Sequence, residues 1–274
     1  MEKLPDNLFD IIIADPPYNI GKDFGNKSDK QNMEEYVKWS KKWIKEAFRV
    51  LSENGTIYIY GFSEILAHIS VNIKYDKRWL IWHYTNKNIP SLNFWQRSHE
   101  SIICSWKNTP IFNKDLVREP YTELFLNNAA GKVRRATGGR FSKGDKETIY
   151  NAHDCGALPR DVIKIGTLAG GKGSTERFFY CKWCNNIFPS KDKPLHKEHE
   201  IIIHPTQKPN ELTRKLILGA YDINKKSKIL IPFAGSGSEC FVAKQLGLDF
   251  LGFEINKDYV KLGNSLTDRI NNFL

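Results

Sequence analysis

Apolar residues recur along this chain with two different periods. Short runs rich in isoleucine and aromatic residues alternate with longer segments in which apolar positions recur every three or four residues. The first pattern favours β-strands and the second favours amphipathic helices. Strands are predicted at 9–14, 56–61, 79–84, 100–106, 228–232 and 249–254, and helices at 33–51, 63–73, 210–221, 239–246 and 256–273. Such alternation is typical of an α/β fold, a mostly parallel sheet with helices on both faces.

Polar residues at the ends of these segments predict where elements begin and turn. Asn32 and Glu35 have the spacing of a capping box before the first helix. Asn54-Gly55 predicts a turn into the strand at 56–61. Ser63 is the predicted cap of the helix that follows this strand.

The regular pattern stops after Trp106 and returns near His204. From 107 to about 199 the chain is basic, rich in glycine and without clear periodicity. Five basic residues of this stretch are candidates for contact with phosphate groups: Lys132, Arg134, Arg135, Arg140 and Lys143. A solvated basic loop is the alternative interpretation.

Composition narrows the class of protein further. The chain has 274 residues, enough for one large α/β domain with an insertion or for two small domains. Its net charge of +10 favours a polyanionic partner such as nucleic acid, although a generally basic protein would look the same. Five cysteines argue against a secreted disulfide scaffold, and no apolar run reaches membrane-spanning length. A soluble, intracellular protein without a membrane partner is therefore expected.

The tetrapeptide Asp15-Pro16-Pro17-Tyr18 follows the first predicted strand. A carboxylate at a strand end can accept a hydrogen bond from an amino group. The two prolines stiffen the turn and can aim the Pro16 carbonyl at the same group. Tyr18 supplies an aromatic face for stacking. A strand that merely ends in a proline turn is the alternative interpretation.

A second motif lies far along the chain. The strand at 228–232 leads into Phe233-Ala234-Gly235-Ser236-Gly237-Ser238, then a helix, and then a strand that ends at Glu254. Glycines allow a ligand to approach the backbone, and an acid at the next strand end can bind ribose hydroxyls. A third glycine is missing, which argues against a dinucleotide. For the glycines alone, a tight turn between strand and helix remains an alternative.

The order of these motifs, with His204-Pro205-Thr206-Gln207-Lys208-Pro209 between them, resembles the β class of DNA amino-methyltransferases. These enzymes use S-adenosylmethionine. The resemblance covers roughly 4–106 and 200–265. It implies a Rossmann-like methyltransferase fold with a seven-stranded, mostly parallel sheet, one antiparallel strand and helices on both faces. The catalytic and cofactor domain is then predicted at 1–106 and 200–274, and an inserted target-recognition region at 107–199.

The resemblance also implies roles for single residues. Asp15 and the Pro16 carbonyl would hold the target amine, Pro17 would stiffen the turn, and Tyr18 would stack on the base. The implied cofactor-binding residues are Asp15, His204, Thr206, Lys208, Pro232, Phe233, Ala234, Gly235, Ser236, Gly237 and Glu254. Ile231 departs from the family, in which many members carry an acid at this point, so one polar contact to the cofactor is in doubt.

The aspartate before Pro-Pro-Tyr favours the N6 amine of adenine in a flipped base as the target. The N4 amine of cytosine is the alternative, and a DNA-binding module without catalysis is a third hypothesis. The resemblance implies double-stranded DNA as substrate, in the cytoplasm of a prokaryotic cell. It allows a cognate restriction endonuclease as partner and leaves monomer and homodimer open.

An insertion at about 178–200 separates the family's usual neighbouring segments. It contains Cys181 and Cys184, two residues apart, followed by His196 and His199. Two thiolates and two imidazoles can bind a structural zinc ion. The gap between the histidines is shorter than the usual three to five residues. A surface hairpin with free thiols is the alternative.

Overall fold

The computed structural model describes residues 1–22, 24, 29–86, 90–135, 138, 144, 147–168 and 175–269. The chain forms two compact units, one from Met1–Phe112 with Asp161–Leu274 and one from Asn113–Arg160. Arg140 and Lys143, predicted to contact DNA, lie outside the described residues. Among the described helices, none is long and apolar enough to cross a membrane.

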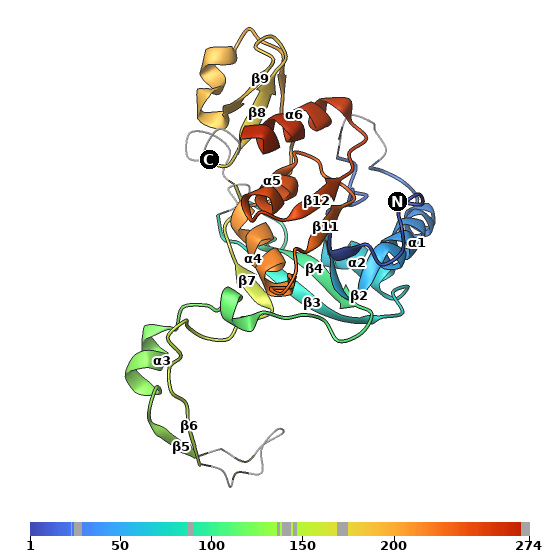
Figure 1. Cartoon of the computed structure of the whole chain (residues 1–274). Coiled ribbons are helices and arrows are strands. Elements are labelled where there is room, and N and C mark those ends of the chain that lie inside the picture. Colours follow the sequence, from blue (N-terminus) through green and yellow to red (C-terminus); the bar gives the residue numbers. More distant parts are fainter. Residues whose placement is uncertain are drawn as a thin grey trace. The chain divides into compact units, whose positions relative to one another are not determined.

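A seven-stranded sheet forms the centre of the larger unit (Figure 1). Its strands follow the order β12 (Asp249–Gly252), β11 (Lys228–Ile231), β1 (Phe9–Ala14), β2 (Leu51–Gly61), β4 (His99–Trp106), β3 (Asp76–His83) and β7 (Val162–Lys164). β4 is antiparallel to both of its neighbours, and the other paired strands are parallel. The predicted mostly parallel sheet with one antiparallel strand is confirmed.

Helices cover both faces of this sheet, as the side chains of β1 show. Ile11 and Ile13 pack in one buried cluster with α4 (Asn210–Ala220) and α5 (Ser238–Gln245). Ile12 packs in a second cluster with α1 (Met33–Val50) and α2 (Ser63–Ser70). Because successive side chains of a strand point to opposite faces, one apolar run serves both layers. The last helix, α6 (Lys257–Asp268), packs beside α5.

Two local predictions are corrected. Asn54-Gly55 is not a turn, because both residues lie within β2, where the register with β1 shifts between Phe9 and Ile11. The chain bulges there instead of reversing. Ser63 is the first residue of α2 rather than its cap. Its hydroxyl contacts the Ser101 hydroxyl at 2.8 Å, which links the helix to β4. The predicted cap of α1 is confirmed, since Asn32 accepts a hydrogen bond from the backbone of Glu34.

The stretch without periodicity forms short elements. In the smaller unit these are η1 (Lys114–Val117), α3 (Glu123–Asn128), and the paired strands β5 (Val133–Arg135) and β6 (Glu147–Ile149). In the larger unit, β8 (Phe178–Cys181), β9 (Asn186–Pro189), η2 (Ser190–His196) and β10 (Ile201–Ile202) form a small antiparallel module. The seventh strand of the main sheet, β7, also comes from this stretch. Three residues are too few to show a period.

Candidate active site

Several strand ends converge at one edge of the main sheet. Asp15 follows β1, Pro232 follows β11 and Glu254 lies just beyond β12. These strands are parallel, so their carboxyl ends lie at the same edge, where ligands of open α/β sheets bind. A cavity of about 930 Å³ lies here. Most predicted catalytic and cofactor residues line it: Asp15, Pro16, Pro17, Tyr18, His204, Thr206, Lys208, Pro232, Phe233, Ala234, Gly235, Ser236 and Glu254.

Three side chains, Tyr18, Glu100 and Lys208, gather at the Asp15 carboxylate. The Tyr18 hydroxyl lies 2.8 Å from Asp15 Oδ1 and 2.9 Å from Glu100 Oε2. A phenol carries one proton, so it donates to one carboxylate at a time. The Lys208 ammonium donates to Asp15 Oδ2 at 2.6 Å and lies 3.7 Å from Glu100 Oε2. Lys208, predicted to reach the cofactor's carboxylate, therefore pairs with Asp15 in this structure.

Burial and the neighbouring carboxylates together set the charges of Lys208 and Tyr18. Desolvation alone would lower the pKa of Lys208, but the carboxylates of Asp15 and Glu100 outweigh it and raise the pKa. Desolvation, together with the same carboxylates, raises the pKa of Tyr18 well above its usual value. Lys208 is therefore charged and Tyr18 neutral at physiological pH. The carboxylates of Asp15 and Glu100 thus share the Lys208 ammonium, and Lys22 also lines this cavity.

The proline turn is held from the side of α1. The Tyr36 hydroxyl donates a 2.7 Å hydrogen bond to the Pro17 carbonyl. Tyr36 is almost fully buried, so its own position is set by the core. On the other side, the Tyr18 ring packs edge-to-face on Phe62, with ring centroids 5.2 Å apart. The turn is thus fixed by packing and hydrogen bonding as well as by the restricted proline backbone.

The glycine loop is tied to the end of β12. Gly235 N–H donates to Glu254 Oε2 at 2.9 Å, and Asn256 N–H donates to Oε1 at 2.7 Å. Each carboxylate oxygen keeps a second lone pair, which can accept a hydroxyl. Gly235 has φ +50°, and a Cβ there would lie 2.7 Å from His204 Nε2. Glycine at this position therefore allows the loop to pack directly on the His204 ring.

His204 is buried and uncharged in this wall. Burial lowers its pKa to about 4. Its Nδ1 atom is buried and has no hydrogen-bond partner among the described residues. Gly237, also predicted to bind cofactor, is not among the cavity-lining residues; it packs against the backbone of Gly263 in α6.

Reasoning from the sequence does not find three further acidic residues that line the cavity, Asp29, Glu100 and Glu239. Glu100 reaches the site because β4 runs antiparallel, which brings its first residues to the edge where the parallel strands end. Glu239 lies in the first turn of α5 and is 4% exposed. Burial, and next the charge of Asp15, raise its pKa to about 7. Its place directly after the glycine loop is a signal that could have identified it.

The remaining predicted residues lie elsewhere. Lys132, Arg134 and Arg135 are exposed in and beside the β5–β6 hairpin of the smaller unit. Cys181, Cys184, His196 and His199 are brought together, with ligand atoms all within 4.8 Å of one another.

Comparison with known proteins identifies the family. Residues 9–265 match the model of a family of N6/N4 methyltransferases described as DNA methylases. The chain belongs to this family. The match confirms the amino-methyltransferase class that the order of motifs predicts. This DNA methylase is 29% identical to the type II methyltransferase M.HpaI of Haemophilus parainfluenzae, over 98% of the chain and 71% of the relative. It is 28% identical to the DNA adenine methyltransferase YhdJ of Escherichia coli, over 96% of the chain and 77% of the relative.

Solved structures show the same fold at low sequence identity. The cytosine-N4-specific PvuII DNA methyltransferase superposes with a TM-score of 0.64 at 12% identity, over 99% of this chain and 86% of that one. The complex of M1.HpyAVI with S-adenosylmethionine superposes with a TM-score of 0.53 at 18% identity, over 94% of this chain and 88% of that one. The predicted Rossmann-like methyltransferase fold is therefore confirmed.

Proposed function

We propose that this DNA methylase transfers a methyl group from S-adenosylmethionine to the N6 amine of an adenine that has rotated out of the duplex. The observation that carries the proposal is the group of Asp15, Tyr18, Glu100 and Lys208 in one cavity with the glycine loop. The aspartate before the proline turn and the relationship to an adenine methyltransferase favour adenine over cytosine.

The cavity suits S-adenosylmethionine in shape and charge. Its volume of about 930 Å³ lies at the upper end for small-molecule sites. Glu254 offers free lone pairs for ribose hydroxyls, and the glycine loop lets a ligand approach the backbone. The carboxylates of Asp15 and Glu100 can attract a positively charged sulfonium. The bound cofactor would supply an electrophilic methyl group on this sulfur.

The protein's own residues would prepare the amine for transfer. An exocyclic amine is a weak nucleophile because its lone pair is delocalised into the ring. Asp15 Oδ1 can accept one amine hydrogen if the Tyr18 hydroxyl turns to Glu100, its second acceptor at 2.9 Å. Lys208 keeps Oδ2 in place. The Pro16 carbonyl accepts the other hydrogen. With the cofactor bound, the nitrogen would bond to the methyl carbon as the carbon–sulfur bond breaks, and the amine's surplus proton would leave toward Asp15 or water.

Methylation of plasmid DNA tests the function directly. The protein is incubated with S-adenosylmethionine labelled in its methyl group, and the DNA is digested to nucleosides. Labelled N6-methyladenine is the expected product. Labelled N4-methylcytosine would contradict the choice of base, and unlabelled DNA would contradict the function. Sequencing the modified positions gives the recognition sequence.

Asp15→Asn tests the role of the carboxylate with little change of shape. We expect methyl transfer to fall by at least about a hundredfold, because the amine loses a charged acceptor. Asp76→Asn is the matched control, since Asp76 is exposed at the start of β3, at the opposite edge of the sheet. Circular dichroism should show both variants folded. Near-normal turnover by Asp15→Asn would exclude the proposed role.

A further inference from the structure

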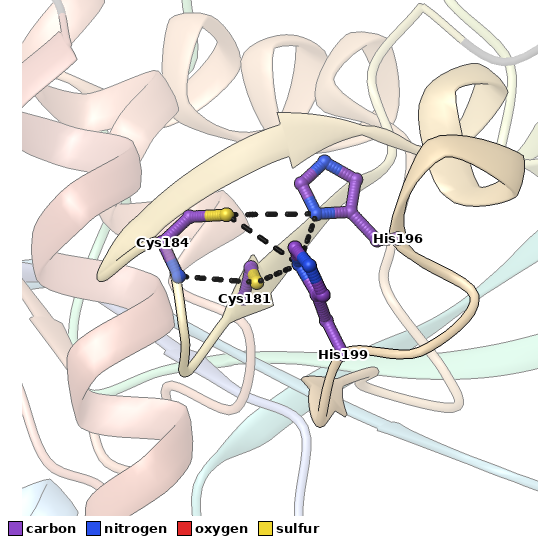
Figure 2. Close-up of side chains that lie close together, drawn as sticks. All are labelled: Cys181, Cys184, His196 and His199. Carbon is purple, nitrogen blue, oxygen red and sulfur yellow. Dashed lines mark hydrogen bonds between the residues drawn. The ribbon is translucent and has the colours of Figure 1, made fainter.

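Four side chains of the small module converge on one point, away from the Asp15 group. Figure 2 shows Cys181 at the end of β8, Cys184 in the following turn, and His196 and His199 facing them from the other side. Each histidine turns the Nδ1 atom inward. The cysteines and the histidines are 12 to 18 positions apart in the sequence. Their contacts therefore depend on how the module folds.

Four of the six distances between the ligand atoms are close to the edges of a tetrahedral metal site, and all six are within 4.8 Å. Cys181 Sγ and Cys184 Sγ lie 3.3 and 3.5 Å from His199 Nδ1, and Cys184 Sγ lies 3.8 Å from His196 Nδ1. The two Nδ1 atoms are 3.2 Å apart. Bond lengths of about 2.3 Å to sulfur and about 2.1 Å to nitrogen give tetrahedron edges of roughly 3.4–3.8 Å. We propose that Cys181, Cys184, His196 and His199 bind one zinc ion.

The short gap between the histidines is explained by the local backbone. η2, a 3₁₀ helix, ends at His196, and His199 N–H donates to the His196 carbonyl at 3.1 Å. In such a turn, residues three apart lie on the same side, because it has about three residues per turn. A two-residue gap therefore brings both rings to one ion, as a longer gap does on an α-helix.

Neighbouring groups hold the four ligands in place. Cys184 N–H donates to Cys181 Sγ at 3.3 Å, which favours a thiolate. The His196 ring stacks on Phe188 with centroids 3.9 Å apart, and the His199 ring stacks on Trp183 at 5.0 Å. Such outer contacts orient metal ligands. Two thiolates balance the charge of a divalent ion, so the buried Cys181 can lie there without a net charge. Two sulfur and two nitrogen ligands favour zinc.

The module is too small to be held by its own core. Its own buried cluster consists of Phe179, Cys181 and Phe188, with two isoleucines packed against it. Large side chains such as Trp183 and Leu195 are 70% and 78% exposed. Small folds with so little buried apolar surface usually need a metal or a disulfide. The zinc ion would replace the missing core, since binding free energy becomes folding free energy.

The module also supports the cavity wall. It lies against α6 (Figure 1), where Tyr180 and Ile202 pack with Tyr259 and Leu262. Lys182 bridges to Asp258 at 3.2 Å. The Tyr259 ring in turn packs edge-to-face on His204, with centroids 4.8 Å apart. Zinc therefore fixes the segment that leads from β10 into His204, and its loss should weaken cofactor binding.

Metal content tests the zinc site independently of methyl transfer. Untagged protein, purified without chelator, should contain about one equivalent of zinc by elemental analysis. Cobalt added to chelator-treated protein should give the visible absorption of tetrahedral, thiolate-bound Co²⁺. Cys184→Ser should lose the zinc, whereas Cys155→Ser, an exposed cysteine of the other unit, should keep it. Folded wild-type protein that contains no zinc and gives no cobalt spectrum would overturn the proposal.

Calorimetric titration with S-adenosylmethionine tests the link to the cavity, which rests on the proposed function. We expect Cys184→Ser to bind about tenfold more weakly than Cys155→Ser. If both folded variants bind S-adenosylmethionine equally well, the module does not support the cavity wall at His204. The conclusion on zinc binding would not be affected. A wild-type protein that holds zinc but does not bind S-adenosylmethionine would count against the proposed function alone.

Discussion

Burial changes the chemistry of single acids in this protein according to what surrounds them. Asp15 pairs with Lys208, whereas Glu239 accepts a hydrogen bond from the Ser238 hydroxyl at 2.8 Å. Glu239 has no ion pair among the described residues, and burial raises its pKa to about 7. An unpaired buried acid is easier to keep protonated than charged. Near neutral pH, Glu239 can therefore act as a donor or as an acceptor within the cavity.

Glu239→Gln should make stability less dependent on pH. Below about pH 4.5, Glu239 is protonated in both folded and unfolded protein, and the variant should match wild type. Between about pH 4.5 and pH 7, Glu239 ionises in the unfolded chain but stays protonated in the folded protein. The free energy of unfolding of wild type therefore falls by on the order of 3 kcal/mol over this range. Urea unfolding of the cofactor-free protein at pH 5 and pH 8 measures this. The exposed control, Glu211→Gln in the first turn of α4, should change little. Equal stabilities of Glu239→Gln and wild type at pH 8 would contradict the assignment.

The start of α5 and the helix α6 pack against each other at the glycine loop with almost no space between their backbones. Gly237 has φ +78°, in the left-handed region that favours glycine, and precedes α5. A Cβ on it would lie 2.6 Å from the Gly263 Cα in α6. Backbone atoms cannot move as a flexible side chain does, so this pair of glycines sets how closely α6 approaches the loop. The approach in turn positions Tyr259 beside His204.

Gly237→Ala should therefore lower the free energy of unfolding by more than the strain of a left-handed backbone alone. Gly247→Ala is the matched control, because Gly247 has φ +70° but nothing within 4 Å of its Cβ position. The control should lose about 1 kcal/mol of unfolding free energy from the left-handed conformation. Gly237→Ala should lose a further 1–3 kcal/mol, roughly the cost of overpacking, and bind S-adenosylmethionine more weakly. If urea unfolding shows the same loss of free energy for both variants, α6 can shift away from the glycine loop at no measurable cost.

At the scale of the whole molecule, the positive charge is distributed in a way that suits a DNA substrate. The net charge is +10, whereas the carboxylates of Asp15 and Glu100 lie together in the cavity, around Lys208. Lys132, Arg134 and Arg135 project from an exposed hairpin in the separate unit 113–160. Phosphate contacts give affinity without sequence information, whereas base contacts give specificity. We expect this hairpin to supply the first kind of contact.

Replacing Arg134 and Arg135 by alanine should reduce the salt dependence of DNA binding. Each lost phosphate contact lowers the slope of log affinity against log salt concentration by about 0.9, so the pair should lower it by about 1.8. Lys41→Ala with Lys42→Ala, two exposed charges on α1, is the control with the same net charge. Fluorescence anisotropy over a salt series measures both slopes. If the two double variants have the same slope, the hairpin does not contact phosphate.

The sequence by itself determined the local parts of this protein and their class. The apolar runs predicted as strands at 9–14, 228–232 and 249–254 are strands at 9–14, 228–231 and 249–252. Asp15 follows the first strand as predicted, whereas Glu254 lies just beyond β12 rather than at its last position. These predictions succeed because strand periodicity, proline stiffness and glycine freedom act between residues that are close in the chain. The order of the motifs was enough to predict the family, which the family match confirms.

Only the tertiary structure decided what lies across the cavity from these motifs. Glu100 belongs to the Asp15 group because β4 is antiparallel to β2, and strand direction depends on the paths of the connections. Lys208 pairs with Asp15 across 193 positions of sequence. The sequence names the proposed zinc ligands Cys181, Cys184, His196 and His199, but only the fold brings the two cysteines and the two histidines within 4.8 Å of one another. In each case the deciding interaction joins segments whose separation leaves no periodic trace in the sequence.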